Sequence, residues 1–157
     1  MTSCNAVKRL AADEHLLTEN TIYENGEEVS DPRITNQLYQ KPNTKLPILG
    51  VPVRLHIYNS ARPNIDSLLT SRIYDNPKKL KFLRNLWSEK QIIRRIESGI
   101  AFNSWLKKTG EAPTIISEDK TKKSKNRLEA WYWNNGWFNV TSDYKINLEE
   151  NKRGQVE

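Results

Sequence analysis

The hydrophobic pattern of this chain changes its period near residue 136. Upstream of that point, Leu128, Trp131 and Tyr132 lie three and four residues apart, the spacing that lines one face of a helix. Residues 134–136 (Asn-Asn-Gly) then tolerate the left-handed backbone conformation that commonly follows a helix end. The pattern therefore predicts an amphipathic helix that ends at Gly136.

Beyond this glycine, apolar residues occupy every second position, which is the pattern of a strand with one buried face. The apolar residues of this row are Phe138, Val140, Tyr144 and Ile146, and the polar Ser142 is its one interruption. Residues 150–154 then predict a turn, and residues 155–157 predict a second strand that the end of the chain cuts short.

The N-terminal part of the chain predicts one strand followed by one helix. Residues 17–29 combine a β-favouring run with the tight-turn pair Asn25-Gly26. Residues 30–32 (Ser-Asp-Pro) supply a capping side chain and a proline suited to the first turn of a helix. Pro42 closes that helix, because proline disfavours helical geometry in the residue before it.

An excess of roughly 75 residues separates these elements, far more than the connections usual in a compact domain. Residues 53–60 and 77–87 are compatible with helices, and residues 91–96 extend the second of them. Residues 114–116 form a short β-prone run, and residues 117–119 can cap the next helix. We expect a structured insertion within one domain; the alternative is two small domains joined near residues 66–76.

The stretch around the change of period resembles the second half of a POTRA domain. This polypeptide-transport-associated repeat precedes the barrel in outer-membrane β-barrel assembly and translocation proteins. The resemblance rests on the basic helix with its aromatic end and on Gly136-Trp137-Phe138, where the family usually has glycine, tyrosine and phenylalanine. Further stretches are similar to the lipoprotein branch of the translocation and assembly module proteins, namely Cys4-Asn5-Ala6-Val7-Lys8-Arg9, His15-Leu16-Leu17-Thr18, Tyr39-Gln40-Lys41-Pro42-Asn43 and Trp105-Leu106-Lys107-Lys108-Thr109-Gly110-Glu111.

This resemblance implies an α+β fold with elements in the order strand, helix, helix, strand, strand. Residues 1–16 would be a lipoprotein-type lead, and residues 17–157 a POTRA-like domain that is incomplete at its C-terminus. A large, mostly helical insertion would occupy about residues 43–120, and the last strand would be truncated. Gly136, Trp137 and Phe138 would be structural residues of the family motif, together with Trp131, Val140 and Tyr144.

The function implied by the resemblance is non-enzymatic handling of polypeptides on the periplasmic side of the cell outer membrane. Unfolded outer-membrane or secreted polypeptides and other assembly-module subunits would be the partners. In this family the strand after the glycine-aromatic pair lies at a sheet edge, where an extended client can add as a further strand. The expected edge-strand residues are Phe138, Asn139, Val140, Thr141, Ser142, Asp143 and Tyr144.

Cys4 is the only cysteine, so a disulfide within the chain is excluded. Taken alone, it is more often a free thiol near a terminus. The tetrapeptide Met1-Thr2-Ser3-Cys4 nevertheless ends as a bacterial lipoprotein cleavage box ends, although the apolar region and the basic start that should precede it are missing. Together with the resemblance, this leads us to expect lipid attachment at Cys4, with more than one acyl chain for stable anchoring. The resemblance also implies a membrane barrel, not contained in this sequence, as the alternative means of membrane attachment.

Composition leaves one alternative class open. The net charge is +6 and the pI about 9.4, and a basic surface of Lys122, Lys123, Lys125 and Arg127 lies close to several tryptophans. Such a helix could bind single-stranded nucleic acid or an anionic membrane surface. The helical spacing makes the aromatic residues better candidates for the core, so we expect nucleic acid to be an unlikely partner.

Catalytic chemistry finds little support in the sequence. His15 and His56 are the only histidines, and neither has metal-ligand spacing to the other or to Cys4. The sequence contains no glycine-rich phosphate loop. Its mean hydropathy of −0.78 is that of a polar chain, and no apolar run is long enough for a membrane helix. We therefore expect no enzymatic activity, cofactor or metal.

Overall fold

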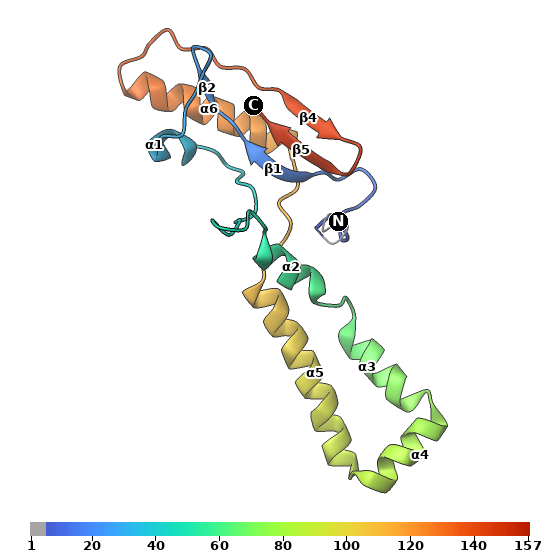
Figure 1. Ribbon diagram of the computed structural model, residues 1–157. Helices are drawn as coiled ribbons and strands as arrows, with labels where there is room; N and C mark the ends of the chain where they lie inside the picture. The colour runs from blue at the N-terminus through green and yellow to red at the C-terminus, as the bar shows by residue number, and fades with distance from the viewer. Residues whose placement is uncertain (1–5) are drawn as a thin grey trace. The chain divides into compact units, whose positions relative to one another are not determined.

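The computed structural model describes residues 6–157, and the chain forms two compact units (Figure 1). Unit 1 is built from the chain up to Pro52 together with Pro113–Glu157, and unit 2 is Val53–Ala112. Helices and short strands are both present, so the predicted α+β class is confirmed. Cys4, the expected lipid-attachment residue, lies outside the described residues. Within residues 6–157, no helix has the length and apolar character needed to cross a membrane.

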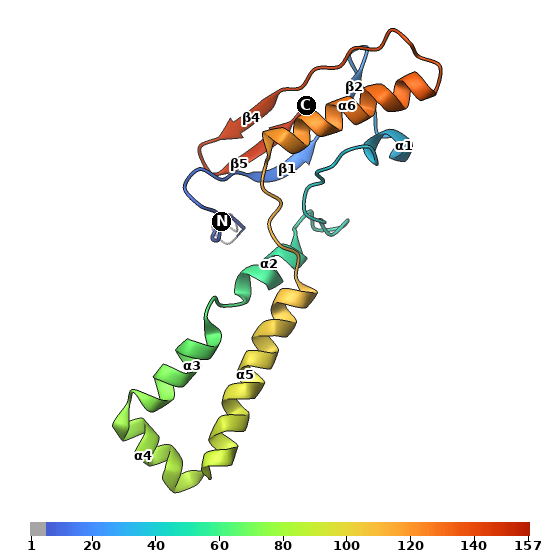
Figure 2. The ribbon, with the colours of Figure 1, turned by 180° about the vertical axis from the view of Figure 1, so that it is seen from behind.

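Unit 1 contains a three-stranded sheet in the order β1-β5-β4. Strand β1 (Leu16–Asn20) pairs in parallel with β5 (Arg153–Val156), and β4 (Ile146–Glu149) pairs with β5 antiparallel. Helix α6 (Glu118–Asn134) covers one face of this sheet (Figure 2). The strand that follows the glycine-aromatic pair is thus an edge strand, and the last strand of the chain is the central one.

The tight turn predicted at Asn25-Gly26 is confirmed. It joins β2 (Tyr23–Glu24) to β3 (Glu27–Glu28), and both turn residues have positive φ, 53° for Asn25 and 91° for Gly26. Two consecutive positive φ angles match the right-handed twist of a hairpin, and asparagine and glycine tolerate them best.

The first helix is shorter than predicted. Helix α1 (Pro32–Thr35) starts at the expected cap but ends well before Pro42. Its continuation is drawn into contacts with distant elements, because the Tyr39 amide donates to Ser124 Oγ (2.9 Å) and the Gln40 carbonyl accepts from Asn20 Nδ2 (2.7 Å). These tertiary hydrogen bonds replace the local ones that a longer helix would need.

The strand predicted from Phe138 onward is wrong for residues 138–145. Helix α6 ends as predicted next to Gly136, whose φ is 94°, but the first strand residue after it is Ile146. Residues 138–144 run alongside α6 instead, and the Ser142 amide donates to a carboxylate oxygen of Glu129 at 3.0 Å. The alternation is still visible in burial, because the even positions 140–146 are half-buried and the odd ones between them are exposed.

Phe138 also departs from its expected buried position. Its side chain is 61% exposed and meets the exposed ring of Trp133 edge-on, with ring centroids 5.0 Å apart. The turn at residues 138–139 removes this residue from the alternating row.

Unit 2 is entirely helical over its named elements. These are α2 (Val53–Ser60), α3 (Ile65–Tyr74), α4 (Pro77–Leu86) and α5 (Glu89–Thr109). Its buried apolar residues are Leu55, Ala61, Ile92 and Ile96. The helices predicted at residues 53–60 and 77–87 are confirmed. Helix α3 was not predicted. Residues 91–96 do not extend α4 as predicted, because they belong to the separate helix α5, which continues to Thr109.

The segments next to unit 2 return to the sheet of unit 1. Thr114 accepts from the Leu17 amide (2.8 Å), and the Ile116 amide donates to the His15 carbonyl (2.9 Å). The β-prone run therefore lies along β1, and α6 begins at Glu118 after Ser117 as predicted. Residues 43–52 and 113–120, which the expected insertion included, belong to unit 1.

Candidate functional site

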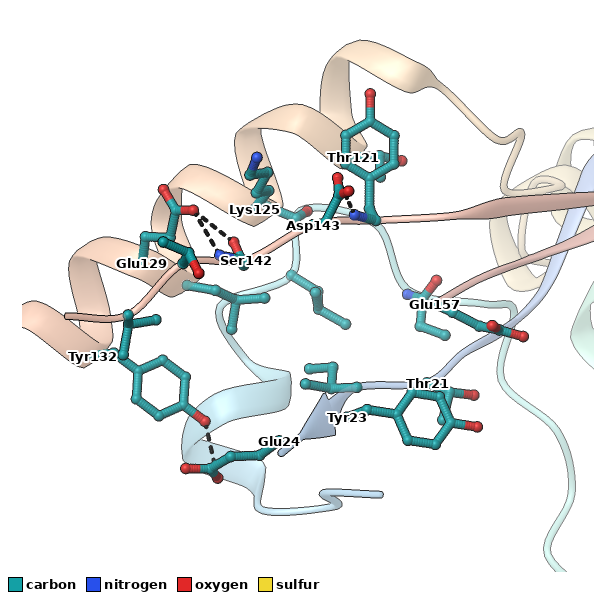
Figure 3. Close-up of a pocket in the computed structure, with 18 of the residues that line it drawn as sticks. Thr21, Tyr23, Glu24, Thr121, Lys125, Glu129, Tyr132, Ser142, Asp143 and Glu157 are labelled. Atoms are coloured by element: carbon teal, nitrogen blue, oxygen red, sulfur yellow. Dashed lines mark hydrogen bonds between the residues drawn. The ribbon is translucent and has the colours of Figure 1, made fainter. Parts of the chain in front are cut away.

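Unit 1 contains a cavity of about 760 Å³, which we call the β5-end slot (Figure 3). Residues 136–144 form one wall and residues 20–25 form another. The end of β5 contributes Val156 and Glu157. Helix α6 contributes Thr121, Ser124, Lys125, Leu128, Glu129 and Tyr132. Figure 3 shows the segment of Ser142 and Asp143 on one side of the slot and the segment of Thr21 and Tyr23 on the other, with Glu157 at one end.

The slot begins where the central strand ends. Val156 pairs with Asn20 of β1 on one side and with Ile146 of β4 on the other. Glu157 and Lys145 then exchange two main-chain hydrogen bonds, both 2.9 Å long. The two segments that flank β5 continue past this point on either side of the slot.

Strand geometry fixes which main-chain groups face the slot. In an antiparallel ladder, residues that exchange both hydrogen bonds alternate with residues whose N–H and C=O point the other way. Lys145 is of the first kind, so an extended backbone before it would direct the N–H groups of Asp143 and Thr141 toward the slot and that of Ser142 away. The Ser142 amide bonds Glu129 accordingly, and in the part of the chain that the structure describes, no hydrogen bond engages the amides of Thr141 or Asp143.

The far end of the slot is closed by a polar pair. The Tyr132 hydroxyl donates to the Glu24 carboxylate at 3.2 Å, which ties α6 to the β2–β3 hairpin. Burial of the Tyr132 ring raises the pKa of its hydroxyl, and the neighbouring Glu24 charge raises this pKa further. Tyr132 therefore stays neutral and remains a donor at physiological pH.

The slot is acidic although the chain is basic. The residues that line it include four acidic ones and one lysine, namely Glu24, Glu129, Asp143, Glu157 and Lys125. Hydrogen bonds from the Ser142 amide and hydroxyl lower the pKa of Glu129, so this group is ionised at neutral pH. An occupant with positive charge would thus be favoured over one with negative charge.

All of the residues expected at the edge strand line this slot, although they do not form a strand. Residues 138–144 make up most of one wall, and Gly136 and Trp137 of the family motif extend it. Sequence reasoning missed the opposite wall at residues 20–25 and the contribution of α6. The β-favouring run at residues 20–24 was visible, but nothing local indicated that it would face residues more than a hundred positions away.

The expected basic surface of α6 is divided rather than continuous. Lys122 is paired with Glu118 at 2.8 Å, and Lys125 lines the slot. Arg127 donates from Nε to Gln37 (3.0 Å) and lies 5.3 Å from the centroid of the Tyr39 ring. Lys123 is exposed on the same side of the helix as Arg127, whereas Lys122 and Lys125 lie on another.

Metal-ligating side chains do not cluster in the described residues. No cluster of three or more histidine, cysteine, aspartate or glutamate side chains among residues 6–157 could hold a metal ion. His15 and His56 are half-buried and lie in different units.

Comparisons of this chain with protein-family models, with curated proteins and with solved structures found no match. Function is therefore argued from the residues of the chain itself.

Proposed function

We propose that the β5-end slot binds an extended segment of another polypeptide as an added strand, antiparallel to residues 138–144. The main observation in support is that the backbone N–H groups of Thr141 and Asp143 have no hydrogen-bond partner in the described chain. Both residues lie in the wall of the slot, next to the place where the pairing of β4 with β5 ends. The protein is then a non-enzymatic polypeptide-handling factor. The POTRA-like motif supports the same class and suggests unfolded outer-membrane or secreted polypeptides as clients, at the periplasmic side of the outer membrane.

The size of the slot suits a short strand but does not by itself select one. A volume of about 760 Å³ lies within the range of many small-molecule pockets. The main-chain pattern is more selective, because donors at alternate residues match the repeat of a second strand. Residues 138–144 would span roughly 20 Å if fully extended, enough to pair with a strand of about five residues.

Recognition through the main chain tolerates many client sequences, while the lining adds a preference of its own. The half-buried Leu128 and Tyr132 offer apolar contact, and the four carboxylates favour lysine or arginine at the ends of the bound segment. A client segment with alternating apolar residues and a basic terminus fits both features.

The proposal can be tested with a labelled seven-residue peptide of alternating valine and threonine that ends in lysine. Fluorescence anisotropy should detect saturable binding to the full chain. A version N-methylated at alternate residues keeps every side chain but loses main-chain donors, so its affinity should fall at least tenfold. Equal affinity of the two peptides would refute strand addition, and a lysine-to-glutamate version should bind more weakly at low salt.

A proline substitution tests the wall of the slot. Thr141→Pro removes an N–H that has no partner in the described chain, so it should weaken peptide binding while the melting temperature changes little. Thr141→Val is the matched control, because it keeps the N–H and should bind as the wild type does. A folded Thr141→Pro protein with unaltered affinity would contradict the proposed binding mode.

A further inference from the structure

The positive charge of this protein is concentrated in unit 2. Residues 53–112 contain twelve lysine and arginine residues against five aspartate and glutamate residues, whereas the rest of the chain is almost balanced. The net charge of +6 therefore arises from the helical unit rather than from the unit that contains the slot. A charge excess of this kind favours an anionic partner.

Helix α4 combines that charge with apolar side chains that its own unit leaves uncovered. No residue of α4 is buried. Leu80 and Leu83 are half-buried on one side, but Phe82 and Leu86, one turn apart, are 62% and 60% exposed. The apolar arc of this helix is thus wider than the surface that packing within unit 2 covers.

Lysines border the exposed pair. Lys78 and Lys79 precede Phe82 by four and three residues, so they lie on the same side of the helix, and Lys81 is close by. None of these three lysines forms an ion pair within residues 6–157. By contrast, Arg84 is paired with Glu89 at 3.2 Å. We define the α4 face as Lys78, Lys79, Lys81, Phe82 and Leu86.

We infer that the α4 face binds an anionic membrane surface, with the lysines among the lipid headgroups and Phe82 and Leu86 at the boundary with the acyl chains. A basic amphipathic helix lies on a membrane in this way, because one surface offers both negative charge and an apolar phase. A single-stranded nucleic acid also supplies negative charge, but it has no apolar phase to cover an aliphatic side chain such as Leu86. The inference does not depend on polypeptide binding in the slot.

Sedimentation of the full chain with lipid vesicles tests this inference. We expect binding to vesicles of mixed phosphatidylglycerol and phosphatidylcholine, little binding to phosphatidylcholine alone, and weaker binding to a single-stranded oligonucleotide than to the anionic vesicles. K78Q/K79Q/K81Q should lower partitioning into anionic vesicles by roughly 100-fold, since each basic residue near such a surface contributes about fivefold. The matched control K120Q/K122Q/K123Q removes the same number of charges from α6 and should have a much smaller effect.

A second pair of variants separates insertion from charge attraction. Phe82→Ser with Leu86→Ser should reduce vesicle binding at high salt, where headgroup attraction is screened. Ile48→Ser with Leu49→Ser is the control, because these side chains are also exposed, at 96% and 68%, but lie in unit 1. Far-UV circular dichroism checks that each variant keeps its helices.

Four results would overturn the inference. Three are absence of binding to anionic vesicles, an equal loss in the α4 and α6 lysine variants, and tighter binding to the oligonucleotide than to vesicles. The last result would assign the same lysines to nucleic acid. Unchanged high-salt binding after loss of Phe82 and Leu86 would likewise exclude contact with the acyl chains.

Discussion

Glu129 and Ser142 offer a sharp test of how the wall of the β5-end slot is held. The Glu129 carboxylate accepts two hydrogen bonds from Ser142, one from the amide (3.0 Å) and one from the hydroxyl (2.9 Å). These contacts attach residues 138–144 to α6 at a place where the chain has no strand partner. Removing them should destabilise unit 1 and loosen the wall.

The expected magnitude follows from the number of bonds and their exposure. A hydrogen bond to a charged group contributes about 1.5–3 kcal/mol when buried, and less when water can replace it. Both residues are half-buried, so we take about 1 kcal/mol for each bond, and Glu129→Ala should cost about 2 kcal/mol in the free energy of unfolding. Ser142→Ala removes only the hydroxyl and should cost about 1 kcal/mol or less.

Urea denaturation of the two single variants and the double variant closes a double-mutant cycle. The coupling energy should be about 0.5–1 kcal/mol, because the hydroxyl bond can be lost only once. Purely additive effects would refute the claim that this contact stabilises the segment. The loosened wall should also weaken peptide binding in Glu129→Ala more than in Ser142→Ala.

The pH dependence gives an independent check on the same contact. Ser142 lowers the pKa of Glu129 below its ordinary value of 4.5, so the folded state favours the ionised carboxylate. The stabilisation is therefore complete above pH 4.5 and is lost as the pH falls through the lowered pKa. The difference in stability between wild type and Glu129→Ala should shrink over that interval, and a difference that grows on acidification would contradict the assignment.

Two further predictions concern unit 2. A Cβ at Gly110 would lie 2.5 Å from the backbone nitrogen of Tyr58, so Gly110→Ala should lower the melting temperature. The shift should exceed that of Gly26→Ala, where the cost is only the strain of a positive φ. Equal shifts of the two variants in a thermal melt would contradict this prediction. Asn103 holds the Arg62 main chain with two hydrogen bonds, an accepted one of 2.6 Å and a donated one of 3.0 Å, and its side chain is buried. Asn103→Ala should therefore cost about 2–3 kcal/mol in urea denaturation, and a cost below 1 kcal/mol would mean that water replaces both bonds.

Elements specified by neighbouring residues could be predicted from the sequence. The turn at Asn25-Gly26, the helices at residues 53–60 and 77–87, and the end of α6 beside Gly136 all follow from capping, periodicity and tolerance of positive φ. Each depends on groups within a few residues of one another. The seven residues that line most of one wall of the slot were named from the family resemblance, which implied an edge strand there rather than a cavity.

Where local and tertiary hydrogen bonds competed, the element predicted from local pattern was wrong. The alternation after Gly136 correctly predicted which side chains face inward, but not which partner their backbone would find. The Glu129 carboxylate accepts the hydrogen bond from the Ser142 amide, and the Ser124 hydroxyl accepts the one from the Tyr39 amide beyond α1. Side-chain periodicity reports burial, whereas a strand requires a second chain at hydrogen-bonding distance.

The slot itself was decided by pairing between the two ends of the chain. β1 and β5 are separated by more than a hundred residues, and their parallel register places residues 20–25 opposite residues 138–144. No local pattern encodes that register, because it depends on closing a loop of more than a hundred residues and on burying Leu16 and Leu17 of β1. The sequence by itself determined most of the local elements and pointed to residues 138–144. Only the tertiary structure decided that these residues border a cavity in line with the central strand β5.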